Sequence, residues 1–219
     1  MKQKACALLT FAQDSLESDC FFGENWAVPQ KSAIDSTKLA VFLLLLWGAV
    51  GCGAGDSNIL ELPQVDGKTA KPFETTNVTA VAFIFLSTEC PISNRYAPEV
   101  QRLQGKFSKT AFWLVYPNRG ESDQAVTKHL KEFRHTAPAV RDPQHKLVRL
   151  AQVRVTPEAA VFSPRGELLY HGRIDDRTAD FGKERPEPTT RDLEAALASV
   201  MKGQRPERAA AAAVGCPIR

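Results

Sequence analysis

Residues 78–86 are the part of this 219-residue sequence that most constrains its fold. They form an apolar run of strand length, rich in Val, Ile and Phe, without a regular alternation of polar and apolar side chains. A strand of this kind is buried on both faces, as is typical of the central strands of a sheet that helices cover on both sides. The run therefore predicts an α/β protein with a buried central sheet.

The segments around this run supply the other layers of the expected fold. Apolar residues at three- and four-residue spacing predict helices, and short runs rich in β-formers predict strands. Alternation of strand and helix implies a parallel βαβ unit, while the last two strands form an antiparallel hairpin. The expected fold class is α/β, a three-layer sandwich with a central mixed sheet. The predicted helices are 94–107, 122–133 (capped by Ser122), 142–152 and 191–201 (capped by Thr190), and the other strands are a short one within 60–68, 111–116, 159–162 and 168–170.

An export signal is indicated before this domain. Lys38 is followed by an apolar run at 39–47, then by small residues and Cys52, with no charge before Asp56. The run is short for a membrane span, which needs roughly 20 apolar residues, and it matches the order of regions in a secretory signal. Its Gly-Cys ending resembles a bacterial lipoprotein signal with lipidation at Cys52; an uncleaved anchor and a buried helix are the alternatives. The first two place the domain outside the cytoplasm of a bacterium, associated with the membrane.

This signal divides the sequence into four parts. Residues 1–37 are expected to be a disordered extension or the result of a start assigned too early, and residues 38–55 to be the signal or anchor. Residues 56–203 hold the predicted α/β domain, and residues 204–219 form an Ala-rich tail that contains Cys216. The two cysteines of the first part, Cys6 and Cys20, have no predicted role.

The spacing of cysteines, histidines and charges excludes several classes of protein. None of the five cysteines lies within four positions of another, which excludes the Cys-x-x-Cys pairs of zinc ribbons and of c-type haem attachment. His129 and His135 are six positions apart and do not share a helix face. No metal, haem or other cofactor is therefore expected. The net charge of +3 is spread without a basic block, which argues against nucleic acid as a partner.

Cys90 lies where a thiol gains reactivity. The buried strand ends near Leu86, and a helix is predicted just after Cys90, with Pro91 at its first position, where a missing N–H costs nothing. Cys90 then occupies the N-cap, where free backbone N–H groups and the helix dipole stabilise a thiolate. The alternative is a buried cysteine that acts only as a small apolar side chain.

Two proline landmarks give the sequence a resemblance to the thioredoxin superfamily, and more closely to its redoxin (AhpC/TSA-like) branch. Cys90 matches the first cysteine of the family's strand–Cys-x-x-Cys–helix motif, and Pro98 matches the helix-kinking proline eight residues on. Thr156-Pro157 matches the cis-proline that packs against the active cysteine, and cis bonds are essentially confined to X–Pro. Over residues 58–202 the resemblance implies a thioredoxin-like fold, with Cys90 as nucleophile and Pro157 positioning the substrate backbone.

The sequence departs from the family at the second cysteine, which is Ser93 here, so that the motif reads Cys-Pro-Ile-Ser. A single thiol can attack a disulfide and hold a mixed disulfide, but a serine at position 93 cannot resolve it. Cys216 is one candidate resolving thiol, because a flexible tail of its length reaches roughly 20 Å. An external thiol and the substrate itself are the other candidates. The plainer interpretations keep Ser93 as a helix cap and Cys216 as an idle thiol or a crosslink to another chain.

Three functions are compatible with this site. The first is an extracytoplasmic thiol–disulfide oxidoreductase that uses a single active-site cysteine, acts on protein thiols or disulfides and depends on an external reductant. The second is a peroxiredoxin-like thiol peroxidase, an antioxidant enzyme acting on peroxide. For that chemistry Ser87 lies three residues before the cysteine, as the family requires, and Arg154 or Arg173 would stabilise the thiolate, but Phe83 replaces the family's proline. The third is a redoxin-fold binding module without turnover.

Overall fold

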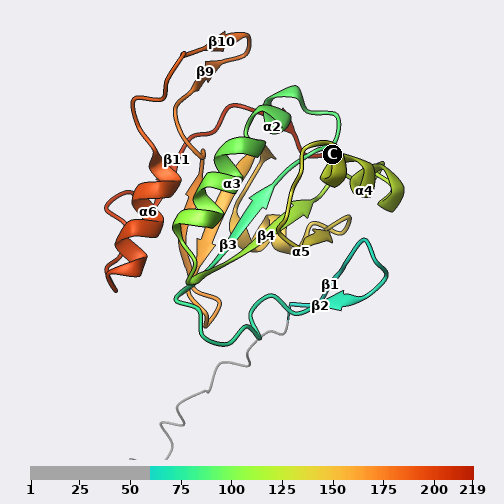
Figure 1. Ribbon diagram of the computed structural model, residues 1–219, viewed down its shortest axis with the longest axis horizontal. Helices are drawn as coiled ribbons and strands as arrows, with labels where there is room; N and C mark the ends of the chain where they lie inside the picture. The colour runs from blue at the N-terminus through green and yellow to red at the C-terminus, as the bar shows by residue number, and fades with distance from the viewer. Residues whose placement is uncertain (1–59) are drawn as a thin grey trace, which may run out of the picture. The chain divides into compact units, whose positions relative to one another are not determined.

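A six-stranded mixed sheet lies at the centre of the protein in a computed structural model that describes residues 60–219 (Figure 1). Its strands follow the order β11-β8-β7-β3-β4-β5. β3 is parallel to β4, β4 to β5 and β11 to β8, whereas β7 is antiparallel to both β3 and β8. The strands are β3 (Ala80–Phe85), β4 (Thr110–Tyr116), β5 (Ala139–Arg141), β7 (Glu158–Phe162), β8 (Leu168–Gly172) and β11 (Ala210–Ala211).

The central strand β3 confirms the prediction from the apolar run. Every one of its residues is buried, between β4 on one side and β7 on the other. Successive side chains of a strand point to opposite faces, so β3 contributes to two separate cores. The predicted α/β sandwich with a central mixed sheet is therefore confirmed. Ala80, Ala82 and Ile84 belong to one core, and Val81, Phe83 and Phe85 to the other.

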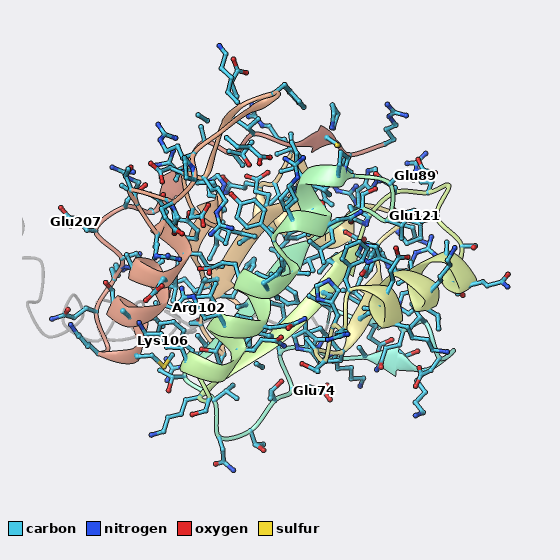
Figure 2. The ribbon with its side chains drawn as sticks, turned by 45° about the horizontal axis from the view of Figure 1, so that its top comes forward. Glu74, Glu89, Arg102, Lys106, Glu121 and Glu207 are labelled. Atoms are coloured by element: carbon cyan, nitrogen blue, oxygen red, sulfur yellow. The ribbon has the colours of Figure 1, made fainter. Side chains whose placement is uncertain are left out.

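Helices cover one of these cores, and a helix and a short hairpin cover the other. Arg102 and Lys106 of α3, both labelled in Figure 2, pair with Glu194 of α6 and hold these two helices together. α3 (Ala97–Lys106), α4 (Asp123–Glu132) and α6 (Asp192–Met201) bury side chains in the first core, while α5 (Lys146–Ala151), β1 (Leu62–Pro63) and β2 (Thr69–Ala70) bury theirs in the second.

The helix that the sequence predicts at 94–107 is two helices in the structure. α2 (Pro91–Arg95) begins immediately after Cys90, as the position of Pro91 predicts, and α3 follows Tyr96. Pro98 lies in the first turn of α3, where its missing N–H is tolerated. Within one continuous helix the same proline would remove a hydrogen bond and clash with the preceding turn. The break therefore places the N-terminus of a short, separate helix at Cys90.

Two further helix starts test the predicted caps. Ser122 caps α4 as predicted, because its side chain accepts a hydrogen bond from the Ala125 N–H. The predicted cap Thr190 is wrong by one residue, since Arg191 is the N-cap residue of α6. Thr190 Oγ1 instead donates to Asp192 at 3.1 Å. A hydroxyl beside the helix start thus binds a side chain of the first turn rather than the backbone.

The sequence does not predict the shortest strands. β5 went unpredicted, and the helix expected at 142–152 begins only at Lys146. Strands of two or three residues are too short to show a periodicity, so pattern analysis does not detect them. The other unpredicted strands are β2 and β11, whose bounds are given above, and β6 (Val155–Thr156), β9 (Thr178–Asp180), β10 (Lys183–Glu184) and β12 (Cys216–Pro217).

The segment 204–219 returns to the fold at two places. β11 adds to the β8 edge of the central sheet, and β12 pairs antiparallel with β6. The first contact requires Gly172, because a Cβ there would lie 2.0 Å from the Ala211 carbonyl oxygen. The segment that the sequence analysis describes only as a tail is therefore packed against the domain.

The predicted signal or anchor at 38–55, with Cys52, and the extension at 1–37 lie outside the residues that the structure describes, as do Cys6 and Cys20. Within residues 60–219, no helix combines the length and the apolar character needed to cross a membrane.

Candidate active site

Cys90 lies at the junction between the central strand and α2. β3 ends at Phe85, and Cys90 is the N-cap residue of α2, with Pro91 directly after it. Its backbone is extended (φ −87°, ψ 110°), and its carbonyl accepts the Asn94 N–H, the first hydrogen bond of the helix. The placement predicted for Cys90 is confirmed, and the residue is only 1% exposed.

The bond between Thr156 and Pro157 is cis, as the resemblance implies. Thr156 ends β6, and its carbonyl oxygen lies 3.1 Å from Cys90 Sγ. Thr156 is fully buried, so this contact is shielded from water. The structure thus brings Cys90 together with Thr156 of the cis-proline loop, although these residues are 66 positions apart in the chain.

Cys216 reaches the same point from the segment 204–219. In the pairing of β12 with β6 it lies opposite Thr156, whose Oγ1 donates to the Cys216 carbonyl at 3.4 Å. Cys216 Sγ and Cys90 Sγ lie 2.6 Å apart, and both cysteines are free thiols. The structure therefore gives Cys90 a neighbouring thiol that its own motif lacks.

Burial and nearby donors distinguish the two thiols electrostatically. Burial alone would raise the pKa of Cys90, but hydrogen bonds from the Cys216 thiol and from the backbone and hydroxyl of Ser93 outweigh it and lower that pKa below its ordinary value. Burial, the hydrogen bond to Cys90 and the charge of that thiolate raise the pKa of Cys216 to about 11. Cys90 is therefore the thiolate of the pair, and Cys216 is its proton donor.

Ser93, at the position of the family's second cysteine, is fully buried in α2. Its Oγ accepts the Ser87 N–H at 3.4 Å, which leaves its own proton free to donate to the Cys90 thiolate. The alternative in which Ser93 caps the helix is wrong, because the N-cap residue of α2 is Cys90 and no side chain bonds there. Ser93 thus stabilises the thiolate while offering no second thiol.

A buried glutamate that the sequence analysis did not single out fixes the loop before Cys90. Glu121 Oε1 accepts hydrogen bonds from Ser87 Oγ (2.8 Å), Thr88 N–H (2.7 Å) and Thr88 Oγ1 (3.1 Å). Figure 2 labels Glu121 and also Glu89, which is an exposed residue of the loop before Cys90. Within residues 60–219 the second oxygen, Oε2, has no hydrogen-bond partner. No local sequence signal identifies Glu121, because its partners lie more than thirty residues away.

A buried histidine links α2 to the sheet. His129 Nδ1 lies 2.8 Å from Tyr116 Oη, and Nε2 lies 2.8 Å from Asn94 Oδ1. Burial lowers the pKa of His129, and burial together with repulsion from His129 lowers the pKa of His135 to about 4. The two rings stack with their centroids 5.7 Å apart. The spacing of this pair was tested only for metal binding, whereas in the structure His129 connects Asn94 of α2 to Tyr116 of β4. Among the described residues no group is arranged to hold a metal ion.

The two candidate arginines of a peroxidase mechanism, Arg154 and Arg173, do not hydrogen-bond to Cys90 in the described part of the chain. Arg173 Nε donates to Asp192 at 2.7 Å, and its Nη2 donates to Thr190 at 3.1 Å. Arg154 is exposed, and its recorded hydrogen bonds are made by its backbone. In the described part of the chain no guanidinium hydrogen-bonds to the Cys90 sulfur, which lies against the Thr156 carbonyl oxygen and Cys216 Sγ.

Solved structures share this architecture. An uncharacterized conserved protein from Geobacillus kaustophilus matches with a TM-score of 0.63 and 20% identity, over 73% of this chain and 87% of that chain. A hypothetical protein from Sinorhizobium meliloti 1021 matches with a TM-score of 0.58 and 23% identity, over 73% of this chain and 89% of that chain. A secreted Mycobacterium tuberculosis disulfide oxidoreductase matches with a TM-score of 0.46 and 11% identity, over 68% of this chain and 99% of that chain.

The first two of these likenesses bear on the fold of the chain. No family model matches the sequence, and no curated protein matches it significantly. The fold is thioredoxin-like, with Cys90 at a helix N-terminus and a cis-proline loop against its sulfur. Because the identities given above are below 25%, the structural likeness establishes the fold, and any activity must be argued from the geometry of the site.

Proposed function

We propose that the protein is a thiol–disulfide oxidoreductase in which Cys90 attacks a disulfide of a protein substrate and Cys216 resolves the product. The observation that carries this proposal is the 2.6 Å approach of Cys216 Sγ to Cys90 Sγ beside the loop of Pro157. Exchange through a mixed disulfide needs a second thiol to complete the reaction. Cys216 supplies one that the Cys-Pro-Ile-Ser motif does not contain.

In the first step the Cys90 thiolate attacks one sulfur of a substrate disulfide, R–S–S–R′. A Cys90–S–S–R mixed disulfide forms, and R′ leaves as a thiolate that takes a proton from water. The lowered pKa of Cys90 increases the fraction of attacking thiolate, and the Ser93 hydroxyl stabilises that thiolate before the attack.

In the second step Cys216 loses its proton and attacks Cys90 Sγ. The remaining substrate sulfur leaves as a thiolate, so two electrons have passed to the substrate and the protein holds a Cys90–Cys216 disulfide. An external dithiol then reduces that disulfide by attacking Cys216, which is the more exposed of the two sulfurs. Cys90 leaves as the thiolate, because the thiol of lower pKa is the better leaving group. The second thiol of the reductant then attacks the reductant sulfur bound to Cys216, which releases Cys216 and leaves the reductant as a disulfide.

The test compares wild type with Cys90→Ser and Cys216→Ser after mixing with a mass-labelled peptide disulfide. We expect Cys216→Ser to accumulate a mixed disulfide at Cys90 that wild type resolves, and Cys90→Ser to form none. A mixed disulfide that disappears as fast in Cys216→Ser as in wild type would show that Cys216 is not the resolving thiol.

The same proteins distinguish the alternative functions. Rapid consumption of peroxide that depends on Cys90, without mixed disulfides, would indicate a thiol peroxidase instead. The engagement of the Arg173 guanidinium with Asp192 argues against that outcome. A Cys90 that reacts with neither peroxide nor disulfides would indicate a binding module without turnover.

We also propose that the domain acts outside the cytoplasm at a bacterial membrane. The support is the apolar run 39–47 followed by Cys52, which has the pattern of a lipoprotein signal. Protein disulfides persist in such oxidising compartments, so the substrate would be present there. Intact mass measurement of the membrane fraction is expected to show a lipidated N-terminus at Cys52. An unmodified Cys52 still preceded by residues 1–51 would contradict this placement.

A further inference from the structure

The edge of β6 is covered by the protein's own chain. β12 pairs with it in antiparallel register, with Cys216 opposite Thr156. The pairing continues where the Ile218 N–H donates to the Arg154 carbonyl at 3.1 Å. Main-chain hydrogen bonds provide pairing of this kind, so another extended chain whose side chains fit can occupy the same edge.

β6 has room for one partner strand. Among the described residues it pairs with β12 and with no other strand. The N–H groups of Arg154 and Val155 are already bound to Glu158 Oε2, at 2.8 and 3.2 Å. Two chains therefore cannot pair with β6 at the same time, and an incoming segment must displace β12.

Cys90 is inaccessible while β12 is in place. Its Sγ contacts the Thr156 carbonyl and Cys216 Sγ, and the residue is almost fully buried. A disulfide within another protein is too large to reach this sulfur past the covering strand. Attack by Cys90 on a protein disulfide therefore requires that β12 first leave β6.

Gly215 shows what the edge requires of its occupant. A Cβ at this position would lie 2.4 Å from the Thr156 carbonyl oxygen and 3.2 Å from Pro157 N. The nearer atom belongs to buried backbone and cannot move aside as a flexible side chain would. A chain that pairs with β6 in this register must therefore have glycine immediately before its cysteine.

We propose that β12 occupies the docking site of the substrate, an extended protein segment in which glycine precedes the reactive cysteine, and that substrate and segment 214–219 exclude each other. This inference rests on the proposed function, because it names the substrate class of the same site. β11 keeps the displaced segment tethered at Ala211, and the five residues from there to Cys216 span up to about 17 Å. Cys216 then returns to β6 as the reduced substrate departs.

A binding experiment without redox chemistry tests this inference. The probe is a fluorescent peptide that copies residues 214–219 with Cys216→Ser, and the protein is the full chain carrying Gly215→Val, whose own segment is kept from β6 by the added side chain. We expect this variant to bind the peptide at least roughly tenfold more tightly than wild type, because a tethered segment competes at high effective concentration. A second peptide that also carries Gly215→Val is expected not to bind.

Two further variants keep the test decisive. Gly105→Ala adds a Cβ with no atom within 4 Å and is expected to bind the probe as wild type does. Ile218→Asp disrupts the apolar contacts of segment 214–219 and leaves Gly215 unchanged. If the Gly215→Val protein does not fold, Ile218→Asp is used as the displaced variant instead. Equal affinity of wild type and the displaced variant for the probe, or equal binding of the two peptides, would overturn the inference.

The result is separable from the proposed function. If the probe binds as expected but no mixed disulfide forms at Cys90, the docking site stands and the exchange reaction fails. If Cys216→Ser accumulates mixed disulfides but the two peptides bind alike, the reaction stands and this inference fails.

Discussion

The two thiols of the site lie on segments that are built very differently. Cys90 follows a fully buried central strand, begins a helix and is preceded by a loop bound to a buried carboxylate. Cys216 lies on a two-residue strand outside the central sheet, is itself partly exposed and is followed by the exposed Pro217. The first segment can hold a nucleophile in one position, whereas the second has few contacts to lose when it separates.

This difference bears on how one site performs two steps. Segments held by few buried contacts open at a lower free energy than the core does, and moving elements of binding sites are drawn from such segments. A fixed Cys90 with a detachable Cys216 allows the substrate and the resolving thiol to use the same edge in turn.

The largest loss of stability is expected from replacing Glu121, which holds the loop before Cys90. Glu121→Ala removes the acceptor of three hydrogen bonds and leaves the Thr88 N–H and the Ser87 hydroxyl without it, which is expected to cost about 3 kcal/mol of unfolding free energy. Chemical denaturation measures this loss. The matched control is Glu89→Ala, an exposed residue of the same loop, expected to change stability by less than about 0.5 kcal/mol. Equal losses in the two variants would contradict the role of Glu121.

The stacked pair of His129 and His135 predicts that the protein loses stability in acid. The pKa of His135 is about 4 in the folded protein and near 6.5 when unfolded, so the unfolded state binds a proton first as the pH falls. The free energy of unfolding is therefore expected to fall between pH 6.5 and 4, by up to about 3 kcal/mol from this group. Denaturation at several pH values measures the slope, which His135→Phe is expected to reduce. An unchanged slope in that variant would assign the loss to other groups.

Replacing Ser93 tests the electrostatics of the nucleophile. Ser93→Ala removes a hydrogen bond to a charged sulfur, an interaction of about 1.5 kcal/mol, and is expected to raise the pKa of Cys90. The pH dependence of Cys90 alkylation, followed by mass spectrometry, is expected to shift to higher pH. Ser108→Ala, at an exposed position, is the control. A profile that moves equally in both variants, or in neither, would remove Ser93 from the account.

The smallest effect on stability is predicted for the detachable segment. Ile218→Ala is expected to lower the unfolding free energy by less than about 1 kcal/mol, because this side chain is only partly buried. It is nevertheless expected to speed the alkylation of Cys90 by a bulky maleimide several-fold, since β12 leaves β6 more often. Leu150→Ala, an exposed apolar residue on α5, is expected to leave that rate unchanged. Equal rates in both variants would indicate that β12 does not control access.

The same contrast explains what the sequence reveals and what it does not. Cys90 at a helix start and the cis bond before Pro157 were predictable, because each depends on residues that are neighbours in the chain. The position of Cys216 against Cys90 was one alternative among several, since a two-residue strand has no periodic signal and pairs across 60 residues. Glu121 was missed for the same reason, because its partners are distant in sequence.

Non-reducing peptide mapping of the wild-type protein after reaction with one equivalent of a peptide disulfide tests the central claim most directly. We expect a single crosslink between Cys90 and Cys216 within one chain, together with release of the reduced peptide. A peptide still attached to Cys90 while Cys216 is free, or a crosslink between Cys216 residues of two chains, would contradict it.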